Sequence, residues 1–294
     1  MNSAVVGIGC DQAQKLAAEV LTYSLKQHAR SEIEVIKLNE SPHWADLSRN
    51  IGGRQKTPFS FQRFLLAGHL LASSHDVAIY VDSDMLVLRP IDGLVAAFAA
   101  TGRDIATVAP LTQWRRRQQS SVLVFNRAGA QLLWDSYHRY LRGELSYDEL
   151  IYLRTVNEVG TIPYVWNCLE YLDEAAALIH YTDMDTQPWL RDGNPNAGIW
   201  YTYLWRYVQT ASGRAVLEDE VRLNHVRPAL KEIVELGSSI SAFSSRAQLA
   251  DVFFVPPHRF KRLRSAAVRK MLAPLLRAVV RLQFLLSNGQ PNIR

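Results

Sequence analysis

Strand-like and helix-like segments alternate through the first part of this 294-residue chain, and that order constrains its fold more than any other feature. Apolar runs rich in Val and Ile lie at 5–9, 32–38 and 77–81, and such runs are typical of buried strands. Segments with apolar residues at helical spacing lie between them, at 12–28 and 60–73. Because this alternation is characteristic of α/β domains, we predict a Rossmann-like α/β fold with a mostly parallel central sheet.

The third apolar run ends in two acids, Asp82 and Asp84, with Ser83 between them. A charge next to a core is costly unless it is paired, and hard cations such as Mn²⁺ and Mg²⁺ prefer carboxylate oxygens. Ligands of such sheets bind at the carboxyl ends of the strands, where Asp11 also lies. The acids therefore predict a divalent-cation site. The alternative is a surface turn in which both carboxylates bond local amides.

The second half of the chain predicts shorter elements and more loops. Expected strands and helices lie at 104–108, 120–125, 128–141 (helix), 148–159 (helix), 161–166 and 176–181, and 190–250 is expected to be mostly helical. We predict one domain over 1–250 and a helical C-terminal extension over 251–294.

The net charge of +5 is concentrated in that extension. From Val252 onward there are 9 basic residues and no acid, so the first 251 residues carry a net charge of −4. Apolar residues lie among these cations, with Pro274 interrupting the pattern. This predicts an interfacial helix on an anionic membrane; the alternative is a helix packed on the domain. Nucleic acid is not expected as a partner, because no recognition motif is present.

Cysteine content and the N-terminus indicate the compartment. Two cysteines, Cys10 and Cys168, suggest neither a disulfide framework nor a zinc site, which favours a reducing compartment. We see no signal-peptide pattern and no uninterrupted apolar segment of transmembrane length. We therefore expect a cytoplasmic protein, peripheral on the cytoplasmic face of the membrane.

Five stretches in order, 9–11, 59–64, 82–84, 119–126 and 180–189, carry a family resemblance. Together they resemble the GT-A glycosyltransferases of family 8, which include glycogenin and bacterial lipopolysaccharide galactosyltransferases. The resemblance covers about residues 4–205. It implies an enzyme, a retaining hexosyltransferase that uses Mn²⁺ or Mg²⁺ and a UDP-sugar donor. Its acceptor would be a glycan or a lipid-linked glycan, as in lipopolysaccharide synthesis.

The resemblance also implies roles for individual residues. Asp82, Asp84 and His180 match the metal ligands, and the family's donor-binding positions correspond to Asp11, Arg63, Asp82, Ser83 and Gln187. Gln119 stands where the family often has an Asn facing the sugar, and Asp148-Glu149 resembles an Asp-Gln element near the anomeric carbon, so these three are the catalytic candidates.

The last stretch departs from the family's His-x-x-Gly-x-x-Lys-Pro-Trp signature. It is one residue longer, Asp183 replaces the Gly, and Gln187 replaces the Lys. The missing phosphate-binding cation bears on the identity of the donor more than on the fold, and Arg191 is a candidate replacement.

Structural roles remain open for several of these residues. His180 could be a core histidine and Arg63 a solvated or ion-paired residue of an amphipathic helix. Asp11 could be a plain N-cap, while Asp148 and Glu149 could favour a helix N-terminus electrostatically.

Two other functions remain open for the whole chain. A haloacid-dehalogenase-type phosphatase also uses Asp-x-Asp after a strand, although its motif normally lies on the first strand and has Thr or Val where this chain has Leu86. A catalytically inactive, membrane-bound protein that binds sugar nucleotides would explain the missing Lys.

Overall fold

The structure is a computed structural model, and it divides the chain into two compact units, Met1–Thr182 and Asp183–Arg294. This division differs from the predicted boundary after residue 250, which stays a prediction. The structure describes residues 3–30, 33–41, 44, 58–108, 119–237, 243–252 and 254–258, without the side chains of 58, 119 and 246.

A six-stranded sheet with the order β2-β1-β3-β6-β5-β7 forms the centre of the first unit. Its strands are β1 (Ala4–Gly9), β2 (Glu34–Lys37), β3 (Val77–Asp82), β5 (Ile105–Val108), β6 (Gln119–Asn126) and β7 (Gly160–Ile162). β1 runs parallel to β2 and β3, and β5 runs parallel to β7, whereas β6 is antiparallel to both of its neighbours. The predicted α/β fold with a mostly parallel sheet is confirmed.

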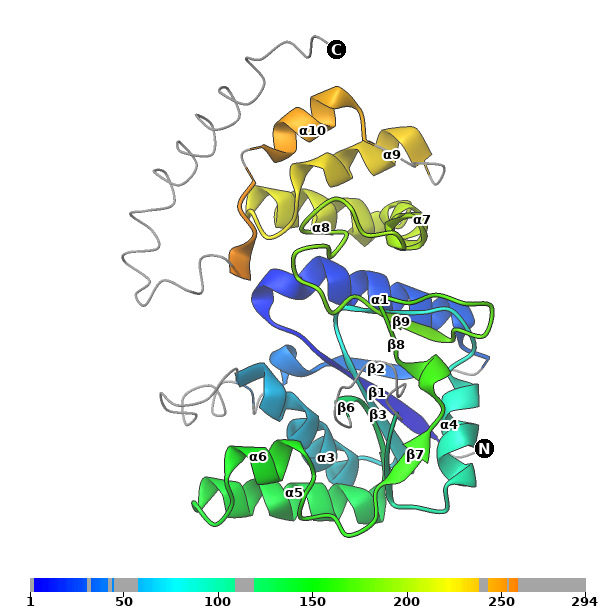
Figure 1. The fold of residues 1–294 in the computed structure, drawn as a ribbon, viewed down its shortest axis with the longest axis vertical. Helices are drawn as coiled ribbons and strands as arrows, with labels where there is room; N and C mark the ends of the chain where they lie inside the picture. The colour runs from blue at the N-terminus through cyan, green and yellow to red at the C-terminus, as the bar shows by residue number, and fades with distance from the viewer. Residues whose placement is uncertain are drawn as a thin grey trace, which may run out of the picture. The chain divides into compact units, whose positions relative to one another are not determined.

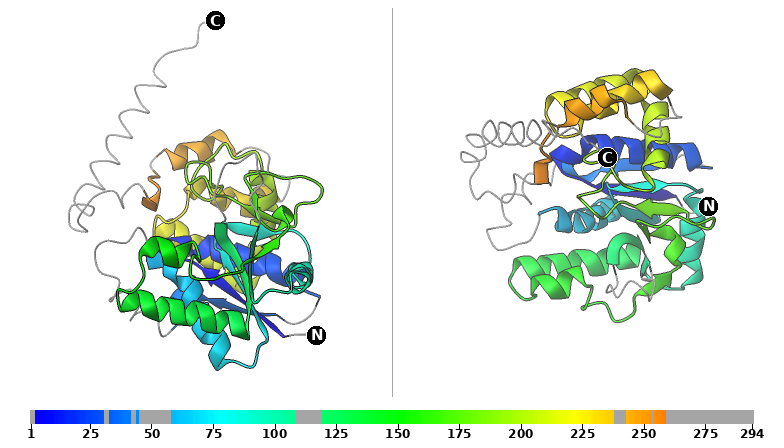
Figure 2. Two further views of the ribbon diagram at one scale, coloured as in Figure 1. Left: turned by 60° about the horizontal axis from the view of Figure 1, so that its bottom comes forward. Right: turned by 45° about the horizontal axis from the view of Figure 1, so that its top comes forward.

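Helices cover both faces of this sheet, because alternate strand residues point to opposite sides. Val5 packs with α3 (Gln62–Ala72), α5 (Arg127–Leu141) and α6 (Tyr147–Ile151) on one face. Val6 and Ile8 pack with α1 (Lys15–His28) and α4 (Asp92–Ala100) on the other. Figures 1 and 2 show α1 on one side of the sheet and α3 with α5 on the opposite side.

A second, three-stranded sheet joins distant parts of the first unit. Its order is β4 (Met85–Val87), β9 (Leu178–His180), β8 (Cys168–Leu169). β4 and β9 are antiparallel, with Met85 opposite His180. The sequence did not predict β4, β8 or helix α4. Short 3-10 turns complete the unit at Gln12–Gln14, Leu38–Glu40, Pro58–Phe61 and Tyr164–Trp166.

Two sequence predictions were too long. The helix expected over 148–159 is only α6, because the chain leaves the helical conformation at Leu153, which has a φ of 51°. The strand expected over 161–166 ends at Ile162, and Pro163, which has no N–H to donate, precedes a 3-10 turn.

The second unit is helical, as predicted for 190–250. Its helices are α7 (Ala197–Val208), α8 (Ala211–Arg222), the 3-10 turn Pro228–Lys231, α9 (Glu232–Leu236) and α10 (Ser245–Asp251). The Trp189 and Trp200 rings pack in its core, 5.3 Å apart. Buried Arg227 donates from Nε to Asp251 at 2.7 Å and thereby ties α10 to the rest of the unit. The basic segment after His258 lies outside the described residues.

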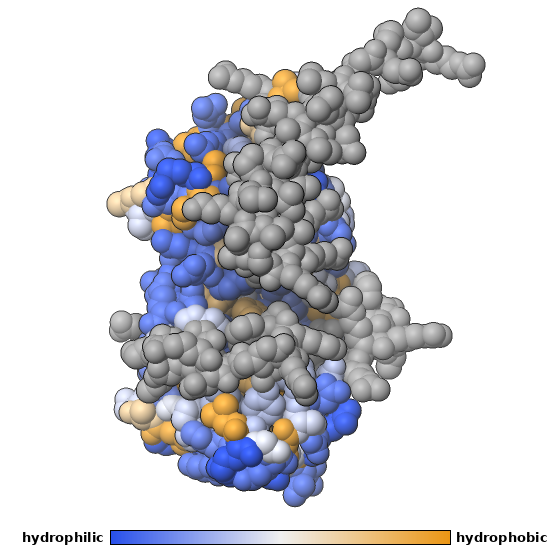
Figure 3. Space-filling view, turned by 90° about the vertical axis from the view of Figure 1, so that its left-hand side faces the viewer, coloured by the Kyte–Doolittle hydropathy of each residue, from blue (hydrophilic) through white to orange (hydrophobic). Residues whose placement is uncertain are grey.

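Apolar surface is scattered over the described part of the face drawn in Figure 3. Figure 3 shows separate orange patches on a largely blue face, outside the grey atoms. None of the described helices combines the length and the apolar character needed to cross a bilayer.

Gly9 gives a test of the close packing beneath the sheet's carboxyl end. A Cβ at Gly9 would lie 2.1 Å from the Tyr80 hydroxyl oxygen, and the Tyr80 ring is fully buried. We therefore expect Gly9→Ala to lower the free energy of unfolding, measured by urea denaturation, by about 1–3 kcal/mol.

Exposed Gly198 is the matched control, because a Cβ there would meet no described atom within 4 Å. Gly198→Ala should change the same quantity by about 0.5 kcal/mol or less. Equal stabilities of the two variants would contradict the packing argument.

Candidate functional site

Asp82, Asp84 and His180 converge where β3 ends. The backbone N–H of Ser83 donates to Gly9 O at 2.9 Å, which turns the chain beside the end of β1. β4 then pairs with β9, and the N–H of Tyr181 donates to Asp84 O at 2.8 Å. Strand pairing therefore places His180 beside an acid that is distant in sequence.

The three side chains form a compact triad. One ligand atom from each lies within 4.8 Å of the other two. His180 Nε2 lies 3.0 Å from Asp84 Oδ1. Asp82 is 8% exposed and His180 is 4% exposed, so two of the three groups are buried. The structure thus brings together the three residues that the sequence predicted as metal ligands.

The electrostatics of the triad favour a bound cation. Burial, together with the neighbouring charge of Asp84, raises the pKa of Asp82, although Arg63, His180 and the Tyr80 hydrogen bond oppose this rise. Burial alone would lower the pKa of His180, but the carboxylates of Asp84 and Asp82 outweigh it and raise the pKa. A positive charge between the two acids would relieve their mutual repulsion.

The residues present fit a hard divalent ion. Two carboxylates and an imidazole are common ligands of Mn²⁺, and carboxylates suit Mg²⁺. The Ser83 hydroxyl and the Arg63 Nε are buried near Asp82 and have no hydrogen-bond partner among the described residues. Because buried polar groups normally have partners, these two atoms indicate a polar ligand beside the triad.

Arg63 is held beside Asp82 by contacts with two strands. One of its terminal nitrogens donates to Ser120 O at 2.8 Å, and its guanidinium carbon lies 4.9 Å from the centre of the Tyr80 ring. The alternative that Arg63 is a solvated surface residue is wrong, since only 6% of it is exposed.

Asp11 caps the turn after β1. Its carboxylate accepts from the N–H of Ala13 at 3.0 Å, and the Gln14 side chain accepts from the N–H of Asp11 at 3.2 Å. The predicted N-cap role is confirmed, and a contact of Asp11 with a nucleotide stays a prediction.

Asp148 and Glu149 lie in the first turn of α6. The Glu149 carboxylate accepts from both the N–H and the hydroxyl of Ser146, at 2.8 and 2.6 Å, and these bonds lower its pKa. Asp148 is exposed. Both acids thus lie where the electrostatic alternative places them, and Glu149 also caps the helix through hydrogen bonds. The catalytic role of either acid stays a prediction.

The structure says less about the surroundings of Gln119 and Gln187 than about those of the other candidates. Gln119 begins β6, and its side chain lies outside the described part of the chain. Gln187 belongs to the second unit, where it is buried, and its N–H donates to Asp183 O at 2.9 Å. The roles predicted for both residues remain predictions.

Sequence reasoning missed three residues that support the site. Gln62 is fully buried and bonds both backbone groups of Cys10, accepting from its N–H at 2.7 Å and donating to its oxygen at 2.8 Å. Tyr80 and Asn167 hydrogen-bond Asp82 and His180. Only Tyr80 left a signal, since it lies two strand positions before Asp82 and so on the same face.

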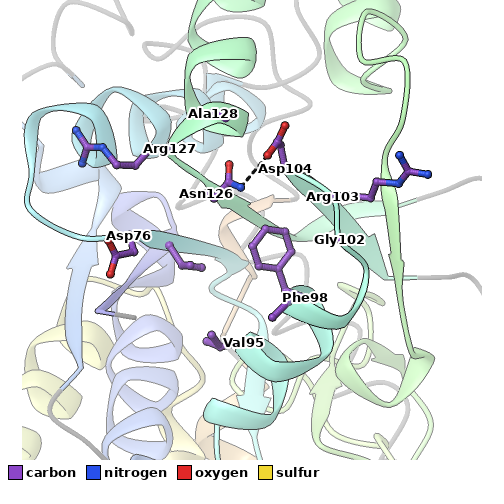
Figure 4. Close-up of a pocket in the computed structure, with 11 residues that line it drawn as sticks. Asp76, Val95, Phe98, Gly102, Arg103, Asp104, Asn126, Arg127 and Ala128 are labelled. Carbon is purple, nitrogen blue, oxygen red and sulfur yellow. Dashed lines mark hydrogen bonds between the residues drawn. The ribbon is translucent and has the colours of Figure 1, made fainter. Parts of the chain in front are cut away.

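A cavity of about 500 Å³ lies at the other end of β3, near Asp76 (Figure 4). The polar side chains that line this cavity form hydrogen bonds that hold the neighbouring helices and strands together. Arg127 donates to main-chain oxygens at the end of α3, and Asn126 caps α5 and donates to Asp104 at 2.8 Å. Because nothing in this lining points to a ligand, we place the candidate site at the triad.

Comparisons with known proteins identify the fold. No protein-family model and no curated protein matches the chain. The structure is similar to the apo form of the glycosyltransferase GlyE from Streptococcus pneumoniae TIGR4, at 18% identity and a TM-score of 0.50, covering 77% of this chain and 64% of GlyE. It is also similar to the bifunctional glycosyltransferase WbbM, at 13% identity and a TM-score of 0.54, covering 74% of this chain and 51% of WbbM.

The chain thus spans less than two thirds of the length of either protein. At these identities the similarity concerns architecture, and the predicted GT-A fold is confirmed.

The raised pKa of His180 can be tested in the metal-free protein. With Asp84 neutralised, burial should dominate, so we expect the pKa of His180 to be lower in Asp84→Asn than in the wild type. An NMR titration of the imidazole measures this, with the exposed Asp135→Asn as control. An unchanged pKa in Asp84→Asn would contradict the proposed electrostatic coupling.

Stability should follow the same shift. A histidine with a raised pKa in the folded state stabilises the protein fully below its unfolded value of about 6.5, and this contribution is lost as pH rises through the folded pKa. The stability advantage of the wild type over Asp84→Asn should therefore shrink with rising pH.

Proposed function

We propose that this protein is a metal-dependent retaining glycosyltransferase related to family 8. It would transfer a hexose from a UDP-sugar to a glycan or lipid-linked acceptor in the synthesis of lipopolysaccharide or another cell-surface glycan. The observation that carries the proposal is the triad of Asp82, Asp84 and His180 at the carboxyl end of β3 in a chain with the GT-A fold. This is the edge at which α/β sheets bind ligands.

The triad would hold Mn²⁺ or Mg²⁺. When bound, such an ion stabilises the negative charge that a nucleoside diphosphate gains as it leaves. The protein's own part is to favour the ionised form of buried Asp82, whose pKa Arg63, His180 and the Tyr80 hydrogen bond lower against the effect of burial. It also holds His180 Nε2 3.0 Å from Asp84 Oδ1, so that the three ligand atoms remain close together.

Donor contacts are proposed for residues around the triad. Arg63 Nε and Ser83 Oγ are two buried donors without a partner in the described part of the chain, which suits hydroxyl groups of a sugar or ribose. Asp11, fixed by its cap at the end of β1, is the proposed nucleotide contact. Gln187 occupies the position of the family's phosphate-binding Lys, so the donor phosphates would receive a neutral side chain there, with Arg191 as the nearby cation in sequence.

The residues proposed beside the anomeric carbon are Gln119, Asp148 and Glu149. Ser120 supports including α6 in the site, because it connects this helix with Arg63. Its backbone oxygen accepts from Arg63, and its hydroxyl donates to Ile151 O at 3.4 Å. Asp148 is the exposed acid of this helix, whereas Glu149 is engaged by Ser146. Asp148 is therefore the first of the three to substitute.

A thermal-shift titration with a panel of UDP-sugars tests the donor site. A ligand that binds only the folded state stabilises it by about 2.7 kcal/mol at 100 times its dissociation constant. We expect one UDP-sugar to raise the melting temperature only when Mn²⁺ is present, and Asp84→Ala to abolish the shift. Asp135→Asn should behave like the wild type, since Asp135 is an exposed residue of α5.

Hydrolysis of the same donor separates an enzyme from an inactive binding protein. Losing the metal's charge stabilisation costs several kcal/mol, so Asp84→Ala should reduce turnover by about a thousandfold. If no nucleotide sugar stabilises the wild type with any metal, the proposal fails, and phosphatase activity becomes the next assay.

We also propose that the basic C-terminal segment binds an anionic membrane surface, which would keep the enzyme on the cytoplasmic face near a lipid-linked acceptor. The support is compositional: this segment carries all of the chain's excess positive charge and intersperses it with apolar residues. Each cation near such a surface contributes about 1 kcal/mol, so several together suffice for reversible binding.

Cosedimentation of the full chain with vesicles tests this proposal. We expect binding to vesicles containing phosphatidylserine, weak binding to phosphatidylcholine alone, and release at high salt because charges are then screened. Replacing Arg262, Arg264, Arg269 and Lys270 by Gln should abolish binding. Replacing four exposed cations elsewhere, Lys15, Lys26, Arg206 and Arg214, should not. Equal binding to both kinds of vesicle would contradict an electrostatic role.

A further inference from the structure

Tyr80 holds one oxygen of Asp82. The Tyr80 hydroxyl donates to Asp82 Oδ1 at 2.8 Å, and both side chains lie on the same face of β3. Tyr80 is fully buried and Asp82 nearly so, which makes a hydrogen bond to the carboxylate strong. The hydrogen bond fixes the rotation of the Asp82 carboxylate about its Cβ–Cγ bond. This rotation decides in which direction the remaining lone pairs of the carboxylate point.

The space for this hydroxyl is provided by Gly9. In the parallel register of β1 and β3, Gly9 lies opposite Asp82. A Cβ at Gly9 would lie 2.1 Å from the Tyr80 oxygen, so any larger residue would occupy the hydroxyl's place. Arg63 lies over the Tyr80 ring at 4.9 Å. The hydroxyl is thus confined to a position from which it reaches Asp82.

Asn167 holds His180 from the other side. His180 Nδ1 lies 2.9 Å from Asn167 Oδ1, and both side chains are buried. An amide oxygen carries no proton, so Nδ1–H is the donor in this bond. In the neutral imidazole the lone pair is then on Nε2, which is the atom that faces Asp84 at 3.0 Å.

We infer that Tyr80 and Asn167 are positioning residues that orient Asp82 and His180 for a divalent cation. The inference rests on the proposed metal-dependent function and extends it to residues that touch neither the ion nor the donor. Outer partners of this kind typically change metal affinity by about 10–100-fold when they are removed.

The test for Tyr80 is Tyr80→Phe, which removes only the hydroxyl. Mn²⁺ affinity is measured by isothermal titration calorimetry, without donor and without any activity assay. We expect the affinity to fall by about tenfold or more. The matched control is Tyr164→Phe, which deletes another tyrosine–aspartate hydrogen bond of the same unit, from Tyr164 to Asp173 Oδ2 at 3.0 Å. That variant should bind Mn²⁺ like the wild type.

The test for Asn167 compares two substitutions. Asn167→Ala removes the acceptor for Nδ1–H and should weaken Mn²⁺ binding by about tenfold or more. Asn167→Asp keeps an acceptor oxygen at nearly the same place and should restore most of the affinity. A merely structural role for this side chain would be expressed in the melting temperature of the metal-free protein, which is measured alongside.

The outcomes separate this inference from the function on which it rests. If the wild type binds Mn²⁺ and both Tyr80→Phe and Asn167→Ala bind within twofold of it, the positioning roles are overturned and the metal site stands. If Asn167→Asp binds as weakly as Asn167→Ala, the acceptor role of Asn167 is overturned. If the wild type binds no Mn²⁺, the metal site itself is overturned, and this inference with it.

Discussion

The burial of Asp82 beside a second acid at the end of β3 is the constraint on which the rest of the site depends. Asp82 is 8% exposed and its neighbour Asp84 is only partly exposed. Burial and the neighbouring charge of Asp84 both raise the pKa of Asp82, so its ionised form needs compensation. The fold supplies that compensation from three directions: Arg63 from α3, His180 from β9, and the Tyr80 hydroxyl from β3 itself.

The register of the strands places these compensating groups within reach of the acids. The parallel pairing of β1 with β3 sets Gly9 opposite Asp82 and opens the space that the Tyr80 hydroxyl fills. The small second sheet sets Met85 opposite His180, so the imidazole reaches Asp84. A shift of one residue in either pairing would move these side chains to the other face of their sheets. The main sheet and the small sheet therefore act together in building one site.

The two ends of β3 serve different purposes. At its amino end, the charged and polar groups of Arg127, Asn126 and Asp104 bond one another or the main chain and hold α3 and α5 in place. At its carboxyl end, Ser83 and Arg63 have buried donor atoms beside two acids, and these atoms have no partner within the described segments. Buried donors normally have partners, so these two atoms beside the acids suit a polar ligand. Together with the triad, they support placing donor and metal at the carboxyl end.

The sequence by itself determined the α/β class, the positions of the first three strands along the chain, and the choice of Asp82, Asp84 and His180 as candidate metal ligands. The α/β class and the two acids follow from local patterns: period-two or helical spacing of apolar residues, and acids at the end of a run. His180 was indicated by the family resemblance of the stretch 180–189. The sequence did not determine the length of α6, the presence of β4 and α4, or the roles of Gln62, Tyr80 and Asn167. Those depend on which segments pair and in what register. Hydrogen bonds between residues distant in sequence leave no periodic trace, so only the tertiary structure decided them.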